Sequence, residues 1–74
     1  MSNVDKIIDK MKRQPNGIRP EEADKVLNAF GYTLERQRGS HRQYLNKQTG
    51  ELTIIKQETP LKKVYVVDIL NRIT

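Results

Sequence analysis

One short segment gathers most of the residues in this chain that can do acid–base or phosphate chemistry. Residues 36–46 read RQRGSHRQYLN and hold the only histidine of the 74-residue chain, His41, together with three of its six arginines. An unperturbed imidazole has a pKa of about 6.5, so it can exchange a proton at neutral pH. Guanidinium groups bind phosphate through charge and paired hydrogen bonds. The segment therefore suggests acid–base chemistry on a phosphodiester.

Such chemistry needs neither a metal nor a protein nucleophile if the substrate is RNA. A base that removes the proton of a 2′-hydroxyl group lets that oxygen attack the adjacent phosphorus and cleave the strand. His41 is the candidate base, and Arg38 is the candidate for holding the phosphate and stabilising the phosphorane. The other candidate RNA-binding residues are Arg36, Gly39, Ser40, Arg42 and Lys56.

Other catalytic classes lack the residues that they need. One histidine without any cysteine cannot supply the usual ligands of zinc. The acidic cluster of Glu21, Glu22 and Asp24 is explained by the start of a predicted helix, where negative charge is favourable. Ser40 and His41 are neighbours on a predicted strand, so their side chains point to opposite faces and do not form a nucleophile–base pair. We expect no metal and no cofactor.

The charge of the chain is placed unevenly. Its formal net charge is +5; residues 1–31 carry six Lys or Arg against five acids, whereas residues 32–74 carry eight against four. This excess predicts a basic surface in the C-terminal part, suited to phosphate or to an acidic protein. A solvated basic face without a partner explains the charge equally well.

Composition also bears on the compartment. The chain has no cysteine and no apolar run near the ~20 residues of a membrane span, and its N-terminus lacks a signal-peptide core. We expect a cytoplasmic protein with no membrane partner, and a single domain over residues 1–74.

Two helices are expected before the middle of the chain. Residues 3–13 form one apolar stripe, with Ser2 or Asn3 as N-cap. Residues 20–30 form a second stripe that begins with proline and is stopped by Gly31. The apolar positions of the two stripes are Val4, Ile7, Ile8 and Met11, and Ala23, Val26, Leu27 and Phe30.

The remainder is predicted to contain three strands and a helix. Residues 32–37, 40–46 and 51–56 read as strands, and their short connections require an antiparallel meander. Residues 63–73 are ambiguous between strand and helix, and a helix is favoured because it can cover the sheet. The fold class is α+β, in the order α-α-β-β-β-α, with the helices packed on one face of a three-stranded antiparallel sheet.

Strand alternation predicts which side chains face the helices. Tyr44 is the bulkiest apolar residue of its strand and should face them, which leaves His41 on the open face. The same rule sends Arg36 and Arg42 to the helix side. The other residues expected toward the helices are Leu34, Leu52 and Ile54, and those expected on the open face are Leu45 and Ile55.

The motif Gly39-Ser40-His41-Arg42-Gln43-Tyr44, preceded by Gly31-Tyr32 and Arg36-Gln37, resembles the HicA toxin family of mRNA interferases. The resemblance covers roughly residues 18–73. It implies a double-stranded-RNA-binding-like core over residues 18–74, with residues 1–17 as an additional helix and turn. It also implies a metal-independent endoribonuclease that uses His41, arrests growth, and is inhibited by a HicB-type antitoxin.

One departure from the family pattern leaves alternatives open. Many relatives end the third strand with Pro-x-His, whereas this chain reads Ile55-Lys56-Gln57 and has no second histidine. A non-catalytic RNA-binding module with the same basic face is one alternative, and a protein-interaction domain is another. In both cases His41 is a surface residue without a catalytic role.

Overall fold

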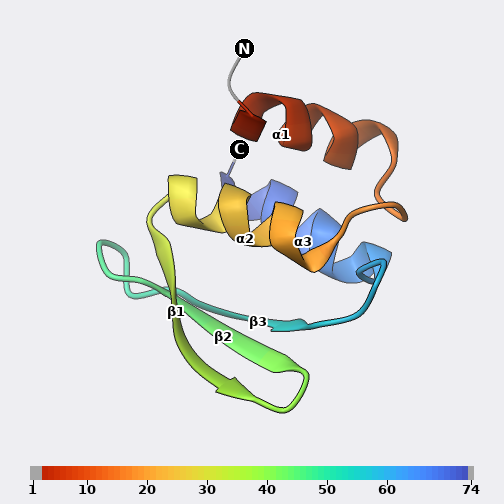
Figure 1. The fold of residues 1–74 in the computed structure, drawn as a ribbon. Helices are drawn as coiled ribbons and strands as arrows, with labels where there is room; N and C mark the ends of the chain where they lie inside the picture. Colours follow the sequence, from red (N-terminus) through yellow and green to blue (C-terminus); the bar gives the residue numbers. More distant parts are fainter. Residues whose placement is uncertain (1–2, 74) are drawn as a thin grey trace.

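Three helices and a three-stranded antiparallel sheet make up an α+β fold (Figure 1). The computed structural model describes residues 3–73. The predicted order of elements is confirmed, and each bound agrees to within one residue. The elements are α1 (Asn3–Arg13), α2 (Pro20–Ala29), β1 (Tyr32–Arg38), β2 (His41–Asn46), β3 (Leu52–Lys56) and α3 (Lys63–Ile73).

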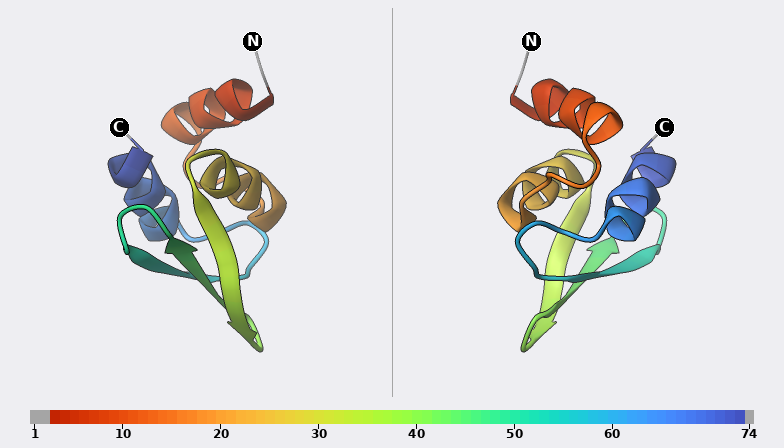
Figure 2. Two further views of the ribbon diagram at one scale, coloured as in Figure 1. Left: turned by 90° about the vertical axis from the view of Figure 1, so that its left-hand side faces the viewer. Right: turned by 90° about the vertical axis from the view of Figure 1, so that its right-hand side faces the viewer.

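The helices lie on one side of the sheet. Helices α2 and α3 cover one sheet face, and α1 lies across them on the side away from the strands (Figure 1). The hairpin of β1 and β2 extends beyond the helices, so its turn lies far from them (Figure 2). Among residues 3–73 no helix is long and apolar enough to cross a membrane. Ser2, one of the two expected N-caps of α1, lies outside the described residues.

A single hydrophobic core joins all three helices to the sheet. Helix α1 contributes Ile7 and Met11, and Met11 is fully buried. The Lys10 ammonium group also bridges α1 to α2, with its Nζ atom 3.0 Å from Glu22 Oε1. Helix α1 is therefore part of the packed core. The other core residues are Ile18, Ala23, Val26, Leu27, Tyr32, Tyr44, Ile55, Leu61, Val66 and Ile69.

The side chains of β3 alternate in the opposite phase to the prediction, so each points to the other face of the sheet. Leu52 and Ile54, expected toward the helices, are 52% and 54% exposed on the open face. Thr53 and Ile55 are buried against the helices instead, so the expectation that Ile55 lies on the open face is also wrong. The apolar residues of this strand fit either phase, and its composition does not decide between them.

The turn after β2 decides the phase of β3. The Asn46 N–H donates to the Glu51 carbonyl at 2.9 Å, and the Gly50 N–H donates to the Asn46 carbonyl at 2.7 Å. These bonds set Asn46 opposite Glu51 and hence Tyr44 opposite Thr53. Cross-strand partners share a face, so Thr53 must face the helices with Tyr44.

The first strand agrees with the prediction only in part. Leu34 pairs with Tyr44 and so has the expected facing, but it is 44% exposed because β1 is an edge strand. Tyr44 itself is buried, as predicted, and Leu45 is half-buried opposite Leu52 on the open face, also as predicted.

Two carboxylates on the helices hold the inner face of the sheet. The Tyr44 hydroxyl donates to Asp24 Oδ1 of α2 at 2.6 Å, and the Thr53 hydroxyl donates to Asp68 Oδ2 of α3 at 3.2 Å. Burial of the ring, and then the bond to Asp24, raise the pKa of Tyr44 to about 12. The tyrosine therefore stays neutral in the folded protein well above its ordinary pKa of 10.0.

We predict that Tyr44→Phe lowers the free energy of unfolding by about 1–2 kcal/mol at neutral pH, because the Asp24 carboxylate loses a donor. The pKa of Tyr44 is higher in the folded state, so its contribution is present below its ordinary pKa and is lost as pH rises toward 12. Urea denaturation of both proteins between neutral and alkaline pH measures this. Equal alkaline losses of stability in the two proteins would contradict the assignment.

A second prediction concerns α1. Met11→Ala removes a fully buried side chain and should lower the free energy of unfolding by about 3 kcal/mol. Lys12→Ala, at the exposed neighbouring position, is the matched control and should change it by less than ~0.5 kcal/mol. Equal effects of the two substitutions would show that α1 does not belong to the cooperative fold.

Candidate active site

The turn between β1 and β2 carries the motif. Gly39 has a positive φ of 55°, whereas Ser40 does not, and the flanking residues Arg38 and His41 are paired. This is the pattern of a type II′ hairpin turn, which favours glycine at its first central position. A Cβ atom on Gly39 would meet nothing within 4 Å, so its backbone conformation, and not crowding, requires the glycine.

Gln37 and Gln57 hold this turn by hydrogen bonds. Gln37 Nε2 donates to the Gly39 carbonyl at 3.3 Å and to Gln57 Oε1 at 3.2 Å. The Gln57 backbone N–H donates to the Ser40 carbonyl. The end of β3 therefore fixes the turn that precedes His41.

An irregularity in β1 changes the position of Arg36. The pairing of β1 with β2 shifts between Leu34 and Arg36, so that Glu35 is the extra residue of a bulge. Beyond the bulge Arg36 lies opposite Gln43, on the open face. The prediction that Arg36 faces the helices is therefore wrong, because strict alternation cannot anticipate a bulge.

The register places the predicted residues in two rows across the open face. His41 lies between Arg38 on β1 and Lys56 on β3. The next row runs from Arg36 through Gln43 to Ile54. Because partners across a strand pair share a face, both rows project from the same surface. His41 is exposed there, as predicted.

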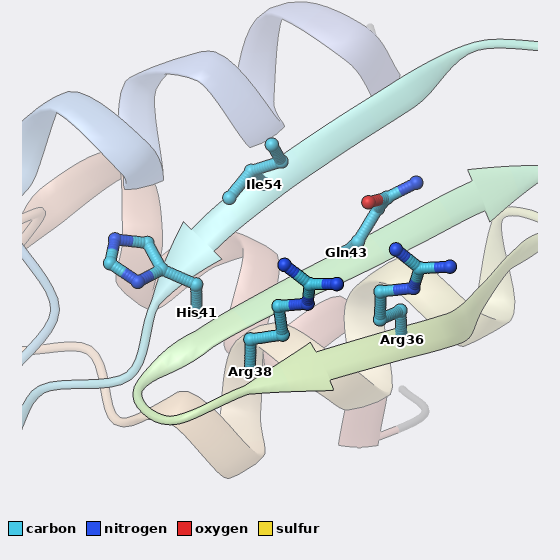
Figure 3. Close-up of a pocket in the computed structure, with 5 residues that line it drawn as sticks. All are labelled: Arg36, Arg38, His41, Gln43 and Ile54. Atoms are coloured by element: carbon cyan, nitrogen blue, oxygen red, sulfur yellow. The ribbon is translucent and has the colours of Figure 1, made fainter.

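A pocket of about 240 Å³ lies over these rows. Figure 3 shows the side chains that line it, with His41 at one end, Arg36 and Gln43 at the other, and Arg38 between them. Lys56 belongs to the His41 row and is half-buried, but it does not line the pocket. The lining residues are Arg36, Arg38, His41, Gln43 and Ile54, and none of them is acidic.

Arg42 is separated from this group. It lies in the phase of Tyr44, on the helix side, as predicted from alternation. Its guanidinium lies beside the Tyr44 hydroxyl, and its buried Nε atom has no hydrogen-bond partner among residues 3–73. The fold thus does not bring Arg42 to the pocket with Arg36 and Arg38.

Sequence reasoning missed two pocket residues, Gln43 and Ile54. The sequence analysis assigns no role to Gln43, and Ile54 lies on the face opposite to the predicted one. The register of the β2–β3 hairpin is the signal that places both residues in the pocket. Asn46 lies opposite Glu51, and this pairing sets Gln43 opposite Ile54.

The side chains available here favour proton transfer and anion binding. Two guanidinium groups, which can bind a phosphate, and one exposed imidazole, which can exchange a proton, line the same pocket. Within residues 3–73, no three His, Cys, Asp or Glu side chains lie close enough together to hold a metal ion.

Comparison with known proteins identifies the family. The model of a family described as the HicA toxin of bacterial toxin–antitoxin systems matches residues 20–73 of the 74. No curated protein and no solved structure matches the chain significantly, so the double-stranded-RNA-binding-like character of the core stays a prediction. The matched residues run from α2 to α3 and include the whole sheet with its pocket. The chain belongs to the HicA toxin family and is the toxin of a toxin–antitoxin pair.

Proposed function

We propose that this toxin is a metal-independent endoribonuclease that cleaves mRNA in the cytoplasm, with His41 as its general base. The observation that carries the proposal is the row on the open sheet face in which the exposed imidazole lies between Arg38 and Lys56. The positive charges of Arg38 and Lys56 attract the phosphates of RNA, and so bring a ribose–phosphate chain to the exposed imidazole. Membership of the family supports the same function.

The proposed reaction uses these groups in turn. His41 takes the proton of a ribose 2′-hydroxyl, and the oxygen attacks the adjacent phosphorus. Arg38 binds a non-bridging oxygen and stabilises the charge that grows on the phosphorane, and Arg36 adds positive charge from the next row. The bond from phosphorus to the 5′ oxygen then breaks, and that oxygen takes a proton from solvent. His41 returns its proton to solvent, so that no metal or protein nucleophile takes part.

The remaining predicted residues have supporting roles. Lys56 contributes charge from the neighbouring strand, and the Gly39-Ser40 turn lets the RNA backbone approach His41. Arg42, on the other face, does not contact RNA in this proposal. Its part is to pack beside Tyr44 beneath the site.

We also propose that the partner is a HicB-type antitoxin that covers the open face. The pocket has three groups that bind anions or exchange protons and no acidic side chain, so an acidic surface would fit it. Such a cover would keep RNA from His41 and suppress the growth arrest.

The proposal predicts that His41→Ala reduces RNA cleavage by at least about 100-fold, the usual contribution of a general base. The exposed site tolerates the change, so circular dichroism and thermal unfolding should match the wild type. The measurement uses labelled single-stranded RNA and purified protein in EDTA, with Lys12→Ala on the distant α1 as a control that retains activity.

Two outcomes contradict the proposal. If His41→Ala cleaves at the wild-type rate, the imidazole is not the base. If the wild-type protein binds RNA in a salt-dependent manner but yields no products, the chain is a non-catalytic RNA-binding module.

A further inference from the structure

We propose that Gln43 and Ile54 form a subsite for one unpaired nucleobase, next to the phosphate site at His41. The inference rests on the proposed function, since it takes single-stranded RNA as the ligand. It adds a determinant of sequence preference to a site that otherwise contacts only the RNA backbone.

The position of the two residues fits this role. Gln43 is two residues beyond His41 on β2, and Ile54 is its partner on β3. Two residues of a strand span about 7 Å, so a base on the nucleotide bound at His41 can reach them. Figure 3 shows that Gln43 and Ile54 project from the same face as His41 and Arg38.

The side-chain amide of Gln43 is available to bind a ligand. It is half-buried in the pocket and makes no hydrogen bond to the other residues described in the structure. An amide presents one acceptor and one donor side by side, and base edges present the complementary pair. The side-chain oxygen and nitrogen of Gln43 remain accessible to solvent, so the edge of a base can replace the water that they bind.

Ile54 supplies the apolar part of the subsite. Its side chain is 54% exposed, an unusual position for a large aliphatic residue in a cationic pocket. It offers a surface for the face of a base, and the Arg36 guanidinium at the other end of the row offers a plane for stacking. The row thus combines an apolar contact, an amide and a planar cation, the groups by which proteins bind unpaired bases.

The composition of the pocket favours a nucleotide of RNA over a segment of protein. Its volume of about 240 Å³ is sufficient for one nucleobase. The two arginines and the histidine in the lining favour an anionic group, such as a phosphate, next to the base. A nucleotide supplies a base and a phosphate, and the two rows of side chains that would bind them are two residues apart along β2.

The test uses two matched substitutions on β3 in the full chain. Ile54→Ser alters the pocket, whereas Leu52→Ser alters a residue of the same strand and face, 52% exposed, that lies outside it. The probe is a short single-stranded RNA with every 2′-hydroxyl methylated, which binds without being cleaved. Ile54→Ser should weaken its binding by about fivefold or more, and Leu52→Ser should leave it unchanged.

A third variant tests the amide. Gln43→Met keeps the side-chain length and removes both hydrogen-bonding groups. The wild-type protein should bind four probes that differ in one base with different affinities. Gln43→Met should make these four affinities nearly equal. Circular dichroism and thermal unfolding establish that each variant is folded.

The outcomes separate this inference from the ribonuclease proposal. Equal effects of Ile54→Ser and Leu52→Ser, or wild-type affinity that is the same for an abasic probe, would overturn the base subsite even if the protein cleaves RNA. Base-dependent binding by a protein that never cleaves unmodified RNA would refute the ribonuclease and leave the subsite in place.

Discussion

The division of one small sheet into two faces is the constraint on which the structure depends. Side chains that face the helices build the core, and those that face away remain available for a ligand. The bulge at Glu35 adjusts this division, because it brings Arg36 to the open face. If β1 alternated regularly after Leu34, both arginines of the pocket, Arg36 and Arg38, would face the helices instead.

The two faces are coupled through β2. This central strand pairs with both neighbours, and it carries His41 and Gln43 on one face and Tyr44 on the other. The bond between the Tyr44 hydroxyl and Asp24 of α2 fixes the strand from beneath. The hairpin extends beyond the helices, and this bond anchors it to α2 three residues from the imidazole, as the role proposed for His41 requires.

The sequence was a good guide to the elements and a poorer one to their exact facing. Helical stripes, turn residues and short connections predicted all six elements, and the position of His41 followed from the bulk of Tyr44. The phase of β3 was wrong because Leu52 and Ile54 compete with Thr53 and Ile55, and only the hydrogen bonds of the turn at Asn46 separate the two. Arg36 was misplaced because a bulge depends on strand pairing, which local alternation does not contain.

The chemical nature of the product ends tests the central claim most directly. If His41 activates a ribose 2′-hydroxyl, then mass spectrometry of RNA cleaved by the pure protein in EDTA should find fragments with 2′,3′-cyclic phosphate and 5′-hydroxyl ends. Fragments with 3′-hydroxyl and 5′-phosphate ends would show that water, not the ribose, is the nucleophile. That result would contradict the account of the imidazole between Arg38 and Lys56.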